Sequence, residues 1–337
     1  MAVSTKLIAV VGATGTQGGS VVDTFAVDPL WRIKAITRNT SSAKAQALLS
    51  KHPDTNIDLV AADLSDVSSL VKAFEGATAI FGVTNFWTLY GDEKIQARAA
   101  DEGRSANELC FELELQQGKN IFDAAAQTQG LERLIFSEAP NVSKISDGKY
   151  KYVLHFDSKA FAVEYGQQRY PELWARTSLV RLGTYLENFL NQPYLLPEKN
   201  EEGVFVFVAP GTKETLLPLV VGGVETGTIS KVLVDVPAGK HVIAYRELIK
   251  LETFVEAWSN FLGVTATIDY GGIAAKLAQM PISVELKKEI LEMFNFLGEF
   301  GYIGDDETVI HPKDIGVVSG SVEEWIRERD WCGVVDA

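Results

Sequence analysis

The stretch KLIAVVGATGTQGGS, residues 6–20, decides the fold of this 337-residue chain. Its apolar first half carries the β-branched residues Ile8, Val10 and Val11, which predict a buried strand. Three glycines at a spacing of three follow at once, and residues 20–27 favour a helix. A strand that turns through glycines into a helix directs free backbone N–H groups and the positive end of the helix dipole at one point. The stretch therefore predicts a phosphate-binding turn in a first βα unit, the alternative being a glycine-rich turn without a ligand.

Each glycine of this turn has its own expected role. Gly12 permits the tight turn, Gly15 lets a pyrophosphate approach the backbone, and Gly18 lets helix and strand pack closely. The residues that we expect to bind a dinucleotide at this turn are Gly12, Thr14, Gly15, Thr16, Gln17 and Gly18.

The end of the second expected strand, residues 32–37, indicates which dinucleotide is bound. An NAD-specific site carries an acidic residue there for the ribose 2′-hydroxyl, whereas this chain carries Arg38. A guanidinium pairs with a 2′-phosphate, and Lys44 follows six residues later. The alternative is a solvated basic pair. We predict that the cofactor is NADP(H).

Apolar runs alternate with helical patterns through the first half, which predicts an α/β fold with a doubly wound parallel sheet. Further strands are expected at residues 57–63, 77–84, 133–137 and 178–183, and a strand near 240–245 would return to the sheet. Ligands bind at the carboxyl ends of such strands. The expected cofactor-binding residues at these ends are Asp63 and Leu64, beside the adenine ring, and Thr84, Asn85 and Phe86.

The second half of the chain departs from this alternation. Residues 203–208 and 220–229 suggest short strands and turns, whereas residues 246–261 and 284–300 suggest helices. We predict an NADP-binding Rossmann domain over residues 1–190 and a smaller substrate or partner lobe over residues 191–337.

Composition limits the class of protein. A net charge of −14 disfavours direct nucleic-acid binding, and no apolar run reaches the length of about 20 residues that a membrane span needs. Two distant cysteines form no disulfide framework, and the four histidines show no metal-site spacing. We expect a cytoplasmic protein without a metal, or a nuclear one if it is a regulator.

Five motifs, in order, resemble the NmrA-like family of atypical short-chain dehydrogenase/reductases. They are GATGTQGG at residues 12–19, TRN at 37–39, TNFW at 84–87, HFDSK at 155–159 and VRLGTYLENF at 180–189. The likeness is dense over residues 5–190 and thin afterwards. It implies an NADP-binding Rossmann fold with a smaller, mostly helical C-terminal lobe over the cofactor cleft. It also implies cofactor contacts near the nicotinamide from Tyr185, Leu186 and Asn188, although Tyr185 and Asn188 could equally pack the domain junction.

Reductases of this superfamily use a Tyr-x-x-x-Lys pair on one helix, in which tyrosine protonates the carbonyl oxygen and lysine binds the nicotinamide ribose. This chain carries His155, not tyrosine, four residues before Lys159. Residues i and i+4 face the same side of a helix, so we predict Lys159 as the ribose ligand and His155 as the proton donor. The alternatives are a packing role for His155 and a solvated Lys159. Ser137 and Tyr152 are further candidate donors.

These observations leave two main function classes and a third, smaller possibility. The first is an NADPH-dependent oxidoreductase of specialised metabolism that reduces a carbonyl, enone or imine. Phe86, Trp87 and Tyr90 indicate an aromatic or apolar substrate, and residues 88–104 are expected to form a loop, either a lid or a mobile surface segment. The second is an NADP(H)-binding redox sensor and transcriptional regulator without turnover, with a regulatory protein as partner. The third is a non-redox isomerase or cyclase.

Overall fold

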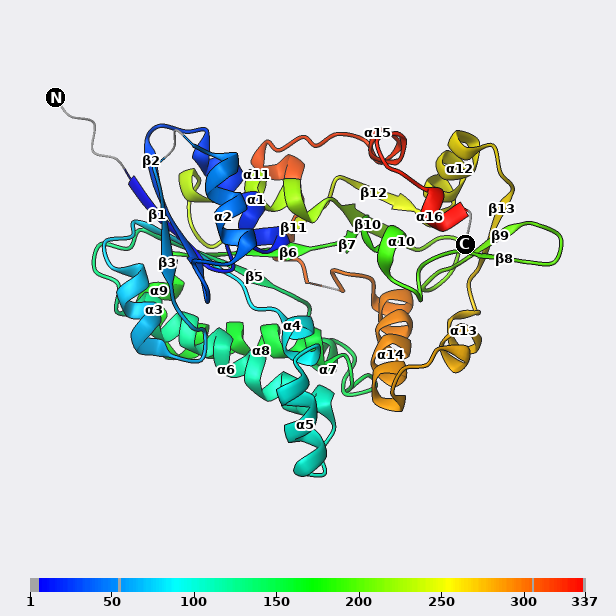
Figure 1. Ribbon diagram of the computed structural model, residues 1–337, viewed down its shortest axis with the longest axis horizontal. Coiled ribbons are helices and arrows are strands. Elements are labelled where there is room, and N and C mark those ends of the chain that lie inside the picture. The colour runs from blue at the N-terminus through cyan, green and yellow to red at the C-terminus, as the bar shows by residue number, and fades with distance from the viewer. Residues whose placement is uncertain (1–5, 54–55, 305, 336–337) are drawn as a thin grey trace.

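A computed structural model describes residues 6–53, 56–304 and 306–335. A large sheet with helices on both faces forms one part of the molecule, and a lobe built mainly from the second half of the chain lies beyond one end of that sheet (Figure 1). The chain passes directly from the sheet into the lobe after Leu182.

The large sheet has eight strands, and every neighbouring pair is parallel. In spatial order they are β14 (Val309–Ile310), β11 (His241–Ala244), β6 (Thr177–Leu182), β5 (Arg133–Glu138), β4 (Ala79–Gly82), β1 (Lys6–Val10), β2 (Trp31–Thr37) and β3 (Ile57–Ala61). The strand order reverses between β1 and β4, which is where a ligand binds in doubly wound sheets. The predicted fold class is confirmed.

Helices cover both faces of this sheet, which is why its strands are nearly continuous apolar runs. On one face lie α1 (Thr16–Ala26), α2 (Ala43–Lys51) and α11 (Gly222–Asp235), and Phe25 and Leu233 pack into the core beneath them. On the other face lie α3 (Val67–Phe74), α6 (Ala106–Ala126) and α8 (Leu154–Arg169), over Phe74 and Phe122. The short helices α7 (Val142–Ile145) and α9 (Pro171–Trp174) flank α8 in the sequence.

The lobe is a set of helices around an aromatic core, with two small sheets. Phe189 and Phe254 stack with ring centroids 4.4 Å apart, and Trp258 is fully buried beside them. The helices are α10 (Asn188–Asn191), α12 (Leu251–Leu262), α13 (Ile273–Gln279), α14 (Val284–Phe300), α15 (Val322–Arg327) and α16 (Cys332–Val335), with a 3-10 turn at Pro312–Ile315. The sheets are β7 (Thr184–Tyr185), β10 (Leu216–Val220) and β12 (Glu247–Lys250), and β8 (Glu198–Lys199), β9 (Phe205–Val208) and β13 (Ala266–Asp269).

The expectation of short strands and turns over residues 220–229 is wrong, because β10 ends at Val220 and α11 begins at Gly222. Close packing of α11 on α1 explains the small residues that suggested turns. A Cβ on Gly227 would lie 2.2 Å from the carbonyl oxygen of Ser20, and Gly227 N donates to Ser20 Oγ at 2.9 Å. The glycine allows two helices to touch and does not mark a turn.

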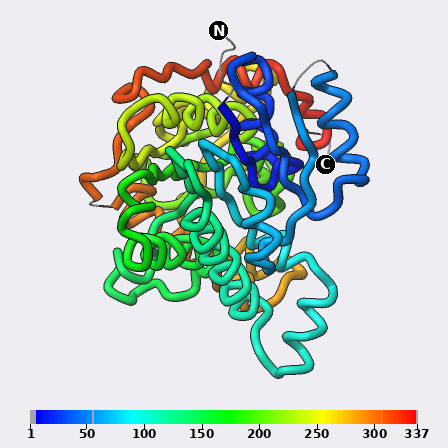
Figure 2. Tube along the Cα trace, turned by 90° about the vertical axis from the view of Figure 1, so that its left-hand side faces the viewer, coloured from blue at the N-terminus to red at the C-terminus, as the bar shows by residue number. Residues whose placement is uncertain are grey.

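The expected loop over residues 88–104 is also mostly helical. It contains the end of α4 (Phe86–Tyr90) and all of α5 (Glu93–Asp101). Ala99 is the one buried residue of α5, so this helix has no apolar face from which its period could be recognised. Figure 2 shows this segment, in blue-green, extending away from the rest of the chain.

Candidate functional site

The glycine-rich turn between β1 and α1 is compact, and it needs glycine at two positions. Gly12 has φ +64°, in the left-handed region that glycine favours. A Cβ on Gly18 would lie only 2.3 Å from the carbonyl oxygen of Gly12. That oxygen also accepts a hydrogen bond from Gly15 N at 2.9 Å. The turn therefore presents the N-terminus of α1 at the carboxyl end of β1.

The N-terminus of α1 fits a phosphate group. Gly15 is the N-cap residue, and a glycine has no side chain with which to cap the helix. The N–H groups of the first turn have no partner within a helix, and Gly15 and Thr16 are exposed. Free N–H groups and the helix dipole favour an anion at this point. Thr14, one residue before the N-cap, is partly buried.

Arg38 lies at the end of β2, next to the β1 turn. Its side chain is exposed, and in the described ranges no carboxylate forms an ion pair with it. At the neighbouring end of β3, Asp63 accepts a hydrogen bond from Ser65 N at 2.8 Å. The carbonyl oxygen of Leu64 accepts from Asn120 Nδ2 at 2.7 Å. The guanidinium is thus available for an anionic group at this edge of the sheet.

Two buried polar atoms without partners belong to the first turn of α1 and to the segment that follows β4. Thr84 Oγ1 and Gln17 Oε1 have no hydrogen-bond partner among the residues that the structure describes. The next residue, Asn85, is exposed and caps α4 by accepting from Thr88 N at 3.1 Å. Phe86 is buried, with its ring centroid 6.0 Å from that of His155.

The segment after β6 joins the turn to the lobe. Gln17 Nε2 donates to the Tyr185 hydroxyl at 2.9 Å, and burial raises the pKa of that phenol. The Leu186 side chain packs in the aromatic core of the lobe, so contact with a cofactor from this residue would come from its backbone. Asn188 is the first residue of α10 and is partly exposed.

His155 and Lys159 both lie on α8, but they contact different elements. His155 Nδ1 lies 2.6 Å from Glu289 Oε1 of α14, and the Trp87 ring centroid lies 4.9 Å from the imidazole centroid. Lys159 Nζ forms an ion pair with Glu114 of α6. The Lys159 side chain is 14% exposed and the Glu114 side chain 1%. The ammonium thus has a buried counter-charge.

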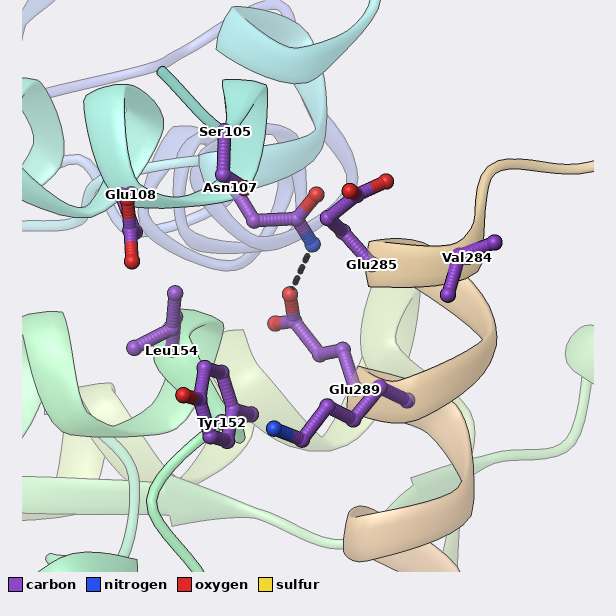
Figure 3. A pocket seen from close by; sticks show the side chains of 9 residues that line it. Ser105, Asn107, Glu108, Tyr152, Leu154, Val284, Glu285 and Glu289 are labelled. Atoms are coloured by element: carbon purple, nitrogen blue, oxygen red, sulfur yellow. Dashed lines mark hydrogen bonds between the residues drawn. The ribbon is translucent and has the colours of Figure 1, made fainter.

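Two buried carboxylates of this site were missed in the sequence. Glu114 accepts hydrogen bonds from Ser158 Oγ and Lys159 Nζ, and Glu289 accepts from Asn107 Nδ2. Figure 3 shows Asn107 and Glu289 facing each other beside a cavity of about 310 Å³ between α6, α14 and the segment before α8. No local pattern distinguishes either glutamate from the solvated charges around it.

The two alternative proton donors differ in their surroundings. Ser137 is buried within β5. Tyr152 precedes α8, which begins at Leu154, so Tyr152 does not share a helix with Lys159. Its ring instead carries the Lys288 ammonium 3.1 Å from the ring centroid. The sequence analysis did not suggest Tyr302. Its hydroxyl forms a hydrogen bond with Thr184 Oγ1 at 2.8 Å, and burial raises the pKa of Tyr302 to about 12.

A second buried ion pair ties three strands of the sheet together. Arg181 Nε of β6 lies 2.6 Å from Glu138 Oε1 of β5, and His241 Nε2 of β11 lies 2.9 Å from the same oxygen. Burial alone would raise the pKa of Glu138, but Arg181 and His241 outweigh it and lower the pKa to about 2. We assign this cluster to the stability of the sheet.

The sequence model of the NmrA-like family matches residues 4–326. This chain belongs to the NmrA-like family. The predicted resemblance is confirmed, and the match extends through the lobe, where the sequence motifs were thin.

One relative is an NmrA-like family domain-containing oxidoreductase of Aspergillus hancockii. It is 31% identical over 193 residues, which make up 56% of this chain and 50% of the relative. The match thus covers about half the length of that relative. A protein of Dictyostelium discoideum with an NmrA-like family domain is 24% identical over 91% of this chain and 93% of its own.

Solved structures share the fold. NmrA, a negative transcriptional regulator, in complex with NADP has a TM-score of 0.70 at 22% identity over 96% of this chain and 95% of its own. An NADPH-dependent quinone oxidoreductase of Escherichia coli, complexed with NADPH, has a TM-score of 0.65 at 20% identity over 95% of this chain and 98% of its own.

None of the described helices is long and apolar enough to cross a bilayer. Within residues 6–53, 56–304 and 306–335, no three His, Cys, Asp or Glu side chains gather as a metal site would require.

Proposed function

We propose that this chain is an NADPH-dependent reductase that acts on a carbonyl, enone or imine of a small aromatic or apolar metabolite. The observation that carries the proposal is the N-terminus of α1, whose N-cap is a glycine, together with an exposed Arg38 that has no ion-pair partner among the described residues. Helix N–H groups suit a pyrophosphate and a guanidinium suits a 2′-phosphate. The structural relatives in complex with NADP and NADPH support the same cofactor.

The proposal assigns a residue to each part of this cofactor. The α1 N-terminus would hold the pyrophosphate, Asp63 and Leu64 would lie beside the adenine, and Lys159 would bind the nicotinamide ribose. Gln17 Oε1, in the first turn of α1, and Thr84 Oγ1, after β4, have no hydrogen-bond partner among the described residues, and a bound ligand would supply one. NADPH, when bound, supplies the hydride.

His155 supplies the proton. Its Nδ1 is held by Glu289, so Nε2 is the nitrogen that would donate to the substrate oxygen or nitrogen. Trp87, 44% exposed and in ring contact with His155, would form an aromatic wall against the substrate. This wall favours a flat or apolar substrate.

The test starts with NADPH titration, followed by NADPH oxidation at 340 nm across a panel of quinones, enones, ketones and imines. His155→Phe should lower kcat by roughly 10²–10⁴-fold and leave NADPH affinity unchanged, because the phosphate contacts lie at the other end of the cofactor. His52→Phe, at the end of α2, is the matched control. A wild-type rate in His155→Phe would exclude it as the donor and turn attention to Ser137 and Tyr152.

A second candidate is an NADP(H)-responsive regulator with a protein partner. The buried pairing of Lys159 with Glu114 favours it, because the ammonium does not need a substrate or cofactor to be neutralised. Its structural relative NmrA is a negative transcriptional regulator. Tight NADPH binding without turnover across the whole panel would favour this second function.

A further inference from the structure

We propose that Glu289, on helix α14 of the lobe, is a positioning residue that fixes the tautomer and orientation of His155. This inference rests on the proposed role of His155 as proton donor. Glu289 reaches the imidazole from a helix more than a hundred residues later in the chain, and its side chain is 1% exposed.

The hydrogen bonds at Glu289 specify where the imidazole carries its proton. Oε1 accepts from the backbone N of His155 at 3.0 Å and lies 2.6 Å from His155 Nδ1. An ionised carboxylate can only accept, so Nδ1 must donate. In the neutral imidazole this leaves Nε2 with the lone pair, and after protonation Nε2 carries the proton that can be transferred. Glu289 therefore selects one of two tautomers and aims the reactive nitrogen away from α14.

The carboxylate is itself fixed. Its other oxygen, Oε2, accepts from Asn107 Nδ2 of α6 (Figure 3). Three donors from α6 and α8 thus surround one buried carboxylate of α14, which offsets the cost of burying its charge. A group held at both oxygens cannot rotate without breaking these bonds, so the imidazole is held in one orientation.

The same helix provides an internal comparison. One turn after Glu289, Glu292 accepts from the backbone N–H groups of Lys151 at 2.7 Å and Tyr152 at 2.8 Å. The N-cap residue of α8, Val153, cannot cap the helix with its apolar side chain, and the two carboxylates of α14 hold the start of this helix from the lobe. Of these two carboxylates, Glu289 is the one that contacts the imidazole. Glu292 therefore separates the support of α8 from the positioning of His155.

The lobe thereby controls the state of the proton donor. His155 and Lys159 lie on a helix of the Rossmann part, whereas the group that orients His155 belongs to α14. The donor is complete only while α14 lies against α8.

Nitrogen-15 NMR of the histidine side chains tests this in the protein without substrate, at a pH where the imidazole is neutral. The His155→Phe spectrum assigns the resonances. The wild type should show the Nδ1–H tautomer, Glu289→Leu should lose that preference, and Glu289→Gln, which keeps an oxygen acceptor, should retain part of it. Glu292→Gln, the control, should leave the tautomer unchanged. Given a substrate, Glu289→Leu should lower kcat about tenfold or more with the KM for NADPH unchanged, because the acid is misplaced, whereas removal of a general acid costs roughly 10²–10⁴-fold.

An Nε2–H tautomer in the wild type would overturn the proposal without any variant, as would an unchanged Nδ1–H tautomer in Glu289→Leu. The NMR result does not depend on turnover. If the tautomer responds to Glu289 but His155→Phe reduces substrate at the wild-type rate, the proposed donor role fails while the contact with Glu289 stands.

Discussion

We expect the buried carboxyl of Asp157 to make the folded protein less stable as pH rises. Its side chain faces away from solvent on α8, where the residue is 2% exposed, and Oδ1 accepts from Ser143 N at 3.2 Å. Burial raises the pKa of this carboxyl to about 6, against the effect of the hydrogen bonds from Ser143. The folded protein thus holds a proton here that the unfolded chain releases near 3.8. Asp157→Asn removes that proton and keeps the acceptor oxygen.

These two pKa values determine how far, and in which direction, Asp157 changes the free energy of unfolding with pH. Between pH 3.8 and about 6 the folded state binds more protons than the unfolded state, so this carboxyl lowers the free energy of unfolding as pH rises. A difference of about two pKa units, at 1.36 kcal/mol each, corresponds to about 3 kcal/mol. Asparagine does not ionise. The free energy of unfolding of Asp157→Asn, relative to the wild type, should therefore rise by about 3 kcal/mol from pH 3.8 to about 6. About half of this rise should be reached near pH 5.

Urea unfolding followed by tryptophan fluorescence, at a series of pH values from 3.5 to 7.5, measures this difference. Asp101→Asn makes the same change at the exposed end of α5 and shows what the loss of one solvated carboxyl contributes. A difference between Asp157→Asn and the wild type that stays constant across the window would refute the reasoning. It would mean that the folded protein ionises Asp157 as easily as the unfolded chain does.

Three further substitutions test the charges of the site and the sheet. Arg38→Ala should reduce the preference for NADP(H) over NAD(H) by about tenfold or more, because a hydrogen bond to a charged group contributes roughly 1.5–3 kcal/mol; equal affinities of the wild type for both cofactors in a fluorescence titration would contradict this. Lys159→Met should abolish turnover. It should also lower the free energy of urea unfolding by about 3–5 kcal/mol, since it leaves Glu114 buried without a counter-charge. An unchanged rate and cofactor affinity would exclude Lys159 as the ribose ligand. Glu138→Gln should cost about 3–5 kcal/mol at pH 7, measured in the same way, because Arg181 keeps its buried charge. A loss below about 1 kcal/mol would show that water reaches this pair.

The fold could be predicted because its signals are local. The strand before Gly12 and the helix after Gly18 are adjacent in sequence, and strands buried on both faces are continuous apolar runs. The prediction failed over residues 220–229 and 88–104, where tertiary packing and not local structure determines the residue types. Gly227 is small because α1 lies against it, and α5 buries too little to show a period.

The site could be predicted only in part, for a related reason. His155 and Lys159 share one helix, so their spacing was visible in the sequence. Glu289 and Glu114 meet them only through the packing of α14 and α6 on α8. A glutamate in a polar helix is normally solvated, and only tertiary structure distinguishes one that is buried.

The position of β11 also constrains how the chain folds as it is made. β6 has β5 on one side, and β11, the neighbour on its other side, follows in the chain only after β7, α10, β8, β9, β10 and α11. Synthesis of the residues between β6 and β11 takes on the order of several seconds, and during this time the N–H and C=O groups along that edge of β6 are unpaired. Exposed edges of this kind recruit strands from other chains. The nascent chain therefore depends on β11 to cover this edge, and a fragment that stops at residue 190 would keep the edge open permanently.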